Sequence, residues 1–279
     1  MAVFYNQATL SYNNTTVSSN VVTGTVVDVL SMTKTAVSES YSVGEVLTYT
    51  VSLVNTGTSA LTGLTVTDDL GAYDYDTSTL VPLTYVAGSV KYFVNGVVQP
   101  APAVTAGNTL EITGIGVPAG GNAMLIYQAI PNEFASPEAG SVITNTASAA
   151  GTGVTSVTAS AQVPAASEAV LSVSKSLSPC EVAENGQLTY TFLIQNTGNT
   201  EETGAVLRDT FDPVLNNITV TTNGIERTPV DYDYDPTTGE FATAAASFIV
   251  PAATYTQDTV TGAYTTVPGM TVITITGTI

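Results

Sequence analysis

The sequence contains no histidine, no tryptophan and a single cysteine, Cys180. Catalytic triads and zinc sites draw on histidine and cysteine, so the usual material for such sites is missing. One cysteine cannot form an internal disulfide, and Cys180 is therefore expected to be an unpaired thiol. These shortages predict a protein without enzymatic turnover, without a metal site and without a cofactor.

Positive charge and long apolar runs are also scarce. Five lysine and arginine residues stand against 23 aspartate and glutamate residues, which leaves a formal net charge of −18. Such a chain repels nucleic-acid phosphates and anionic lipid headgroups, so neither nucleic acid nor a membrane is expected as a partner. The first residues lack the basic and apolar regions of a signal peptide. We expect an extracellular protein, or one on a cell or spore surface, without a classical signal peptide.

The residues that are plentiful favour β-strands. Hydrophobic residues make up 44% of the 279 positions, with much threonine, valine, alanine and tyrosine. This length suits two domains of about 100–150 residues each. Alternation with a period of two, interrupted by Asn-Thr-Gly and Asn-Gly turns, predicts half-buried antiparallel strands. We expect an all-β chain with two Ig-like sandwich domains in tandem.

An internal repeat supports two domains of one type. The segment LSMTKTAV, followed by GEVLTYTVSLVNTG and TVTDDL, resembles LSVSKSLSP, followed by GQLTYTFLIQNTG and VLRDTF. The residues paired at one constant offset are Lys34 with Lys175, Tyr49 with Tyr190, Asn55 with Asn196, Gly57 with Gly198, and Asp68 with Asp209.

The two repeats differ in how they close. The first continues into SVITNTASAAG, whereas the second stops at ITITGTI. The N-terminal segment VFYNQATLSYNN resembles SVITNTASAAG and places Asn6 at the position of Asn145. Lys34 follows Asn6 by 28 residues, and Lys175 follows Asn145 by 30. We therefore expect the N-terminal segment to be the closing strand that the second repeat lacks.

This interpretation divides the chain into four parts. They are a donor strand at 1–12, a linker at 13–28, a complete Ig-like domain at 29–165, and an Ig-like domain at 166–279 that lacks its closing strand. A sandwich without a strand exposes apolar core and unpaired backbone groups, which recruit another strand. Donation by a second copy is a heterologous contact and propagates into a filament. The expected donor-strand anchors are Phe4, Ala8, Leu10 and Tyr12.

Alternation also predicts three polar side chains inside each domain. Lys34, Asp68 and Asn145 each share a strand face with apolar residues, which places them toward the first core. The corresponding set for the second core is Lys175, Asp209 and Asn6. Burying such groups costs several kcal/mol unless they satisfy one another.

Two interpretations of these residues remain open. One is a buried Lys–Asp ion pair with a hydrogen bond to asparagine. The other is a spontaneous Lys–Asn isopeptide bond, in which burial lowers the lysine pKa and raises the aspartate pKa. The lysine amine would then attack the asparagine carboxamide while Asp68 or Asp209 moves the protons and ammonia leaves.

The motifs K-T-A-V, G-x-x-L-T-Y-T, N-T-G, V-T-D and T-N-T-A resemble the bacterial conserved-repeat surface family catalogued as domain of unknown function eleven. That family is similar to Ig-like pilin and adhesin modules that carry Lys–Asn cross-links. The resemblance implies a bond between Lys34 and Asn145 with Asp68 as catalyst. By the repeat, it implies a bond between Lys175 and Asn6 with Asp209 as catalyst.

The leading hypothesis is a structural subunit of a self-assembling fibre, for instance a spore appendage, whose only partner is a second copy of itself. One alternative is a monomeric or surface-attached adhesion module in which the N-terminal strand folds onto its own second domain. Another is a glycan-active enzyme that uses Asp231, Asp233 and Asp235. Those three residues are spaced like the start of a calcium loop, but the following Gly and Glu are misplaced, which favours an exposed acidic hairpin.

Overall fold

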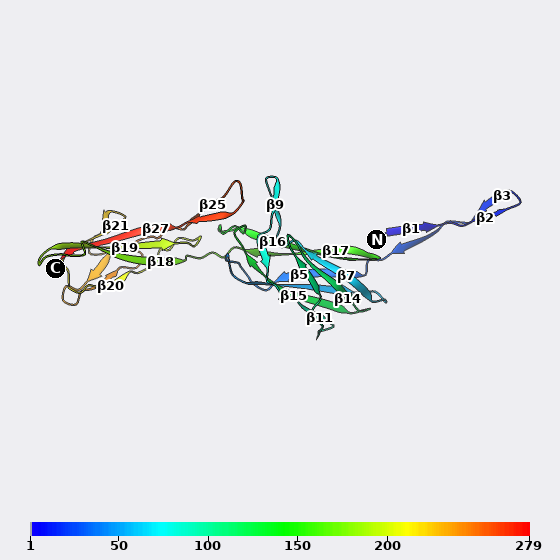
Figure 1. Cartoon of the computed structure of the whole chain (residues 1–279), viewed down its shortest axis with the longest axis horizontal. Helices are drawn as coiled ribbons and strands as arrows, with labels where there is room; N and C mark the ends of the chain where they lie inside the picture. Colours follow the sequence, from blue (N-terminus) through cyan, green and yellow to red (C-terminus); the bar gives the residue numbers. More distant parts are fainter. Residues whose placement is uncertain (1) are drawn as a thin grey trace. The chain divides into compact units, whose positions relative to one another are not determined.

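The computed structural model describes residues 2–279, and its regular structure consists of β-strands without a helix in that range (Figure 1). The all-β prediction is confirmed. Two compact units are present. The first comprises the chain up to Glu39, together with Gly44–Asn132 and Ile143–Val163, and the second comprises Ser40–Val43, Glu133–Val142 and Pro164–Ile279. Over residues 2–279, no helix has the length and hydropathy of a membrane span.

The first unit is an Ig-like sandwich of two antiparallel sheets. One sheet has the order β12-β11-β15-β6-β5, with the short β10 (Leu83–Tyr85) also paired to β15. Its strands are β5 (Leu30–Ala36), β6 (Leu47–Asn55), β11 (Lys91–Val94), β12 (Val97–Val98) and β15 (Asn122–Pro131). The other sheet has the order β13-β14-β7-β16-β17. Its strands are β7 (Leu61–Asp68), β13 (Ala103–Ala106), β14 (Leu110–Val117), β16 (Val142–Gly151) and β17 (Val154–Pro164).

The second unit repeats most of this plan. Its larger sheet has the order β18-β19-β27-β21-β22, and its smaller sheet has the order β20-β24-β23. The strands of the larger sheet are β18 (Leu171–Ser178), β19 (Gln187–Asn196), β21 (Asn216–Thr222), β22 (Ile225–Glu226) and β27 (Gly269–Thr278). The strands of the smaller sheet are β20 (Arg208–Thr210), β23 (Tyr232–Tyr234) and β24 (Glu240–Thr243).

The registers of the two units coincide. Lys34 pairs with Val51 between β5 and β6, and Lys175 pairs with Phe192 at the same offset between β18 and β19. Strand by strand, β13-β14-β7 corresponds to β23-β24-β20. Within residues 2–279, the second unit has no counterpart of β16 or of β17. The closing strand that the repeat comparison found missing is therefore accompanied by a second missing strand.

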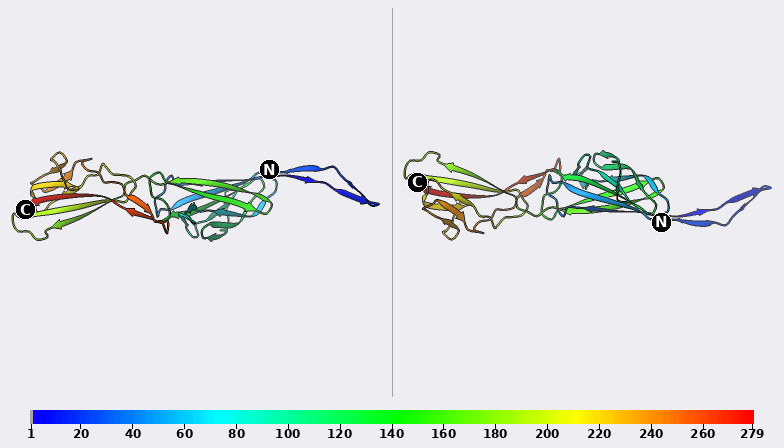
Figure 2. Two further views of the ribbon diagram at one scale, coloured as in Figure 1. Left: turned by 90° about the horizontal axis from the view of Figure 1, so that it is seen from above. Right: turned by 90° about the horizontal axis from the view of Figure 1, so that it is seen from below.

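The N-terminal arm, residues 2–26, forms a two-stranded ribbon, which Figure 2 shows in blue. Strand β1 (Ala2–Asn6) pairs with β4 (Val22–Val26), and β2 (Thr9–Tyr12) pairs with β3 (Thr15–Ser18). The region expected as a linker thus contains two strands. Across the described chain, the arm strands pair with one another and with no strand of either sandwich.

The Asn-Thr-Gly motif of each repeat closes the strand that precedes it. Asn55 is fully buried, donates from Nδ2 to the Ser59 carbonyl at 2.8 Å, and accepts from the Gly57 amide at 2.9 Å. Asn196 makes the same bonds to Thr200 and Gly198, at 2.8 and 2.9 Å. Each asparagine therefore satisfies backbone groups that leave the ladder at the strand end. Their role is structural.

Candidate functional site

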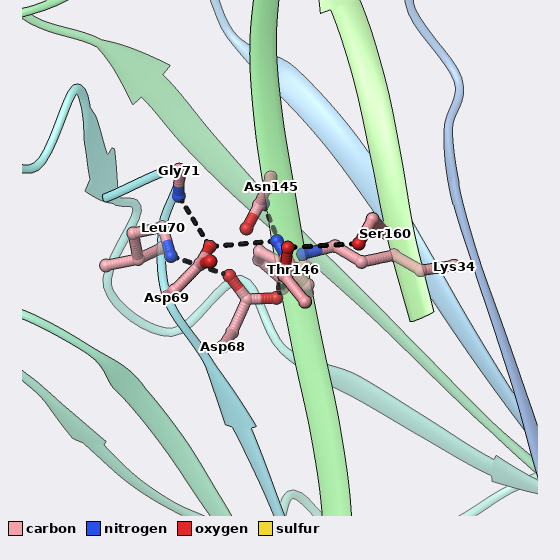
Figure 3. A network of polar contacts seen from close by, with 9 residues as sticks. Lys34, Asp68, Asp69, Leu70, Gly71, Asn145, Thr146 and Ser160 are labelled. Carbon is pink, nitrogen blue, oxygen red and sulfur yellow. Dashed lines mark hydrogen bonds and ion pairs between the residues drawn. The ribbon is translucent and has the colours of Figure 1, made fainter. Parts of the chain in front are cut away.

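The first unit buries an ion pair between its two sheets. Lys34 on β5 and Asp68 on β7 approach to 2.6 Å between Nζ and Oδ2, and their side chains are 0% and 1% exposed (Figure 3). The lysine also lies over the Tyr49 and Tyr127 rings, at 5.2 and 5.9 Å from the centroids. Alternation along β5 and β7 directs both side chains inward, as predicted.

Tyr127 joins this pair to the buried Asn145 on β16. The Tyr127 hydroxyl donates to Asp68 Oδ2 at 2.5 Å and accepts from Asn145 Nδ2 at 3.1 Å. Among the described residues, Asn145 Oδ1 has no hydrogen-bond partner although it is buried. The structure thus gathers the three residues predicted for the first domain, Lys34, Asp68 and Asn145, around one tyrosine. It leaves the carbonyl oxygen of the carboxamide open to a donor.

Burial sets the protonation tendencies of this cluster. Desolvation lowers the pKa of Lys34 below its ordinary value, and the attraction of Asp68 only partly opposes this. Desolvation, aided by the neighbouring Asp68, raises the pKa of Tyr127 well above its ordinary value. Tyr127 therefore stays protonated and donates to Asp68, while the amine of Lys34 is easier to deprotonate than a solvated lysine. A neutral amine is the form that can act as a nucleophile.

The turn after β7 holds the cluster in place. Asp68 Oδ1 accepts from the Leu70 amide at 3.0 Å. Asp69 Oδ1 accepts from the Gly71 amide and from the Thr146 amide of β16, both at 2.8 Å. These bonds, drawn in Figure 3, tie the end of β7 to the residue that follows Asn145. The carboxylate and the carboxamide are consequently positioned by the backbone of adjacent strands.

The second unit repeats the ion pair but not its surroundings. Lys175 Nζ lies 2.5 Å from Asp209 Oδ2, and the two side chains are 40% and 18% exposed. The amine lies 4.4 Å from the Tyr190 ring centroid. In the first unit Tyr127 pairs with Tyr49, and at the equivalent place in the second unit Ile275 pairs with Tyr190. No tyrosine from β27 therefore reaches Asp209, and the amine faces solvent.

The strand that carries Lys175 is more exposed than its counterpart in the first unit. In the first unit Leu30 on β5 is 5% exposed, whereas the corresponding Leu171 on β18 is 40% exposed and Val173 is 60% exposed. Strand β7 has neighbours on both sides, but in the part of the chain that the structure describes β20 pairs with β24 alone. The second unit consequently has an uncovered apolar side between β18 and β20, termed the acceptor groove, where Leu171 and Val173 are exposed beside the partly exposed Lys175 and Asp209.

Asn6, the third residue predicted for this second site, lies in the arm. It belongs to β1 and pairs with Val22. The four expected anchor residues are all exposed to solvent in the single chain; they are Phe4, Ala8, Leu10 and Tyr12. The structure therefore places Lys175 with Asp209 and leaves Asn6 and the four anchor residues on a separate element.

The acidic segment considered for a glycan-active or calcium site forms a short hairpin. Asp233 lies within β23, and Asp231 and Asp235 bind neighbouring threonines. Over residues 2–279, no group of three or more His, Cys, Asp or Glu side chains is arranged to hold a metal ion. The carboxylates of Asp231 and Asp235 accept hydrogen bonds within local turns.

Sequence reasoning missed Tyr127. The signal was present, because alternation along AMLIYQAI places Tyr127 on the inward face opposite Tyr49. A buried tyrosine hydroxyl needs a hydrogen-bond partner. The inward polar groups of the first core, Lys34, Asp68 and Asn145, offered such partners.

Comparison with known proteins adds no family. No protein-family model and no curated protein matches the chain. The fold is similar to the major pilin subunit of Bacillus cereus, with 13% identity over 96% of this chain and 73% of that one and a TM-score of 0.37. A collagen-binding subdomain of an Enterococcus faecalis surface protein matches with 8% identity over 50% of this chain and 99% of its own, at a TM-score of 0.33.

An enzyme that catalyses macrocyclization in alchivemycin A biosynthesis also matches, with 13% identity over 57% of this chain and 96% of its own, at a TM-score of 0.31. These likenesses include a pilin, a collagen-binding surface protein and an enzyme, and each TM-score lies below 0.5. A shared fold does not determine function, so function has to be argued from the sites themselves.

Proposed function

We propose that the chain is a structural subunit that polymerises head to tail on a cell or spore surface or outside the cell. The N-terminal strand, residues 2–12 of one copy, enters the groove between β18 and β20 of the next copy. The observation that carries this proposal is the exposure of Leu171, Val173 and Lys175 on a strand whose counterpart in the first unit, β5, has Leu30 and Lys34 buried. Such an uncovered edge is a template for another strand.

The arm offers a face that fits the groove. Within β16, Ile143, Asn145, Ala147 and Ala149 are buried in alternation. The arm carries Phe4, Asn6, Ala8 and Leu10 at the same spacing, all solvent-exposed in the single chain. Burying a phenylalanine and a leucine stabilises a complex by roughly 1.5–3 kcal/mol each. Because the donor and acceptor surfaces differ, each added copy presents a new groove and a filament grows.

Insertion places Asn6 beside Lys175 and Asp209. This arrangement is equivalent to that of Asn145 beside Lys34 and Asp68 in the first unit. In each site a proton first passes from the lysine ammonium to the aspartate. The amine Nζ then attacks Cγ of the asparagine, and the aspartic acid donates its proton to the carboxamide oxygen. The carboxylate takes the proton released by the attacking amine and delivers it to Nδ2, the Cγ–Nδ2 bond breaks with loss of ammonia, and the hydroxyl proton returns to the carboxylate as the carbonyl re-forms. The Nζ–Cγ bond that forms links β5 to β16 within the first unit. In the second unit it links two subunits covalently.

Substitution of one anchor tests the polymer directly. Leu10→Asp places a charge on the inserting face, while Ser11→Asp places the same charge on the opposite face of the strand and serves as the matched control. Sedimentation and electron microscopy should show filaments for the parent chain and for Ser11→Asp, and monomers for Leu10→Asp and for a chain lacking residues 2–12. Identical filaments from the shortened chain would overturn donor-strand polymerisation.

The competing arrangement, in which the arm folds back into the groove of its own chain, makes a different prediction. It gives monomers at every protein concentration. Association that rises with concentration separates the intermolecular arrangement from this one, because only the former obeys mass action.

A further inference from the structure

We infer that the element donated to the second unit is the whole two-stranded arm, residues 2–26 of a second copy, which takes the place of β16 and β17 together. This inference rests on the proposed polymerisation and specifies what the groove accepts. The second unit has no counterpart of either strand within residues 2–279, and the arm provides two strands. A single inserted strand would leave one of the two positions empty.

The turn of the arm matches the turn between β16 and β17. Two residues, Thr152 and Gly153, connect β16 to β17, and two residues, Asn13 and Asn14, connect β2 to β3. Thr152 follows Asn145 by seven residues, and Asn13 follows Asn6 by seven. Asn13 and Asn14 have φ values of 48° and 63°, which suits the tight two-residue hairpin turn. In both hairpins the turn therefore begins seven residues after the asparagine.

The cross-strand register matches as well. In the first unit Gln162 Nε2 donates to Thr144 Oγ1 at 3.3 Å across the pair β16 and β17. Thr144 lies one position before Asn145, and Gln162 lies 17 positions after it. In the arm, Tyr5 lies one position before Asn6 and Thr23 lies 17 positions after it, and these two residues are direct partners between β1 and β4. Positions that a side-chain hydrogen bond joins between β16 and β17 are thus already direct partners in the free arm.

The second strand of the arm, formed by β3 and β4, corresponds to β17 of the first unit. In the first unit Thr155 Oγ1 on β17 donates to Asp28 Oδ1 at 2.7 Å, which fastens β17 beside the segment that leads into β5. Ala161 and Val163 of β17 are buried. The corresponding side of the second unit is β18, where Leu171 and Val173 are exposed. Strands β3 and β4 of the arm would cover this side while β1 and β2 pair with β20.

Folding the arm before it docks also favours assembly. An isolated two-stranded ribbon is marginal in water and gains most of its stability from packing against other strands. Because its turn and register are set in advance, docking orders fewer residues than the insertion of an unstructured strand does. The donor is accordingly a second copy's hairpin and not an extended tail.

An engineered disulfide tests the position of the second strand. Thr16 lies ten residues after Asn6, as Thr155 lies after Asn145, and Ala169 lies six residues before Lys175, as Asp28 lies before Lys34. We expect Thr16→Cys and Ala169→Cys, in a Cys180→Ser background, to form disulfide-linked multimers on oxidation of filaments. The control pair Thr16→Cys with Val97→Cys, at an exposed site of the first unit, should not cross-link.

The outcomes separate this inference from the proposal on which it rests. Filaments that form without the Thr16–Ala169 disulfide would overturn hairpin donation and leave single-strand donation intact, whereas a parent chain that forms no filament would overturn both. Hydrogen exchange of unmodified filaments provides a second measurement. Amides of residues 15–26 should be protected at least tenfold more strongly than in Leu10→Asp monomers. Equal exchange there, with protection confined to residues 2–12, contradicts the inference.

Discussion

Lys34 and Lys175 occupy the same position of equivalent strands and both contact an aspartate, yet only Lys34 is covered. Their registers against the neighbouring strand coincide, so the difference does not come from the pairing of their own strands. In the opposite sheet, β7 pairs with β16, which carries Asn145 into the buried cluster, whereas within residues 2–279 β20 pairs with β24 alone. One site is closed within the chain, and the other is partly exposed to solvent.

The first prediction concerns the covalent bond in the first unit. The monomeric chain should have an intact mass lower than that of its sequence by one ammonia, because Lys34 and Asn145 are enclosed together. Lys34→Ala and Asn145→Ala should each restore the full mass, while Lys91→Ala, at a lysine exposed on β11, should not. A folded parent chain with the full mass would leave Lys34 and Asp68 as a simple ion pair.

In filaments a second ammonia should be lost for each subunit, and this loss should depend on Lys175 and Asn6. Denaturing electrophoresis should then show covalent ladders for the parent chain. Asn6→Ala should give filaments that dissociate in detergent, because strand insertion remains possible without the bond. Ladders that persist in Asn6→Ala would place the intersubunit bond elsewhere.

Replacing Tyr127 by phenylalanine should destabilise the first unit. The change removes the buried hydroxyl that donates to Asp68, a hydrogen bond that does not depend on Asn145 Nδ2. Leaving a buried acceptor without this donor costs about 1–3 kcal/mol in the free energy of unfolding. Urea denaturation of the Leu10→Asp monomer should show this loss, and Tyr5→Phe, at an exposed residue of the arm, should change stability by less than about 0.5 kcal/mol.

The stability of the first unit should rise with pH when the lysine is free. Burial lowers the pKa of Lys34, so just below the ordinary lysine pKa the unfolded chain binds more protons than the folded chain. In Asn145→Ala, which keeps the amine unacylated, the free energy of unfolding should increase as pH rises from neutrality toward about 10. The double variant Lys34→Met, Asn145→Ala should lack this increase.

Above the ordinary pKa of tyrosine the trend should weaken. The raised pKa of Tyr127 makes the folded state bind the extra proton there, which lowers stability as pH rises further. Urea titrations at a series of pH values measure both effects. A slope that is the same with and without Lys34 would contradict the assignment to this amine.

The arm turn should control the rate of assembly. Asn14 has a positive φ, which glycine adopts freely and β-branched residues avoid. Asn14→Gly should leave filament growth close to that of the parent chain, whereas Asn14→Val should slow it by destabilising the hairpin. Light scattering measures the growth rate. Equal growth of the two variants would show that the turn does not need to form before docking.

The amino-acid sequence by itself determined the strands, the repeat and the inward placement of Lys34, Asp68 and Asn145. It could do so because alternation with a period of two is a local property that a single strand displays. The match of Asn6 to Asn145 is a prediction from sequence similarity and spacing.

Only the tertiary structure decided which groups meet. The bridge through Tyr127 depends on the register of β15 against β6 and on the facing of two sheets, which no single strand reveals. The two-stranded form of the arm depends on pairing between residues up to 24 positions apart, such as Ala2 and Val26. Strand pairing is a relation between segments, and for that reason it becomes visible only when the segments are brought together.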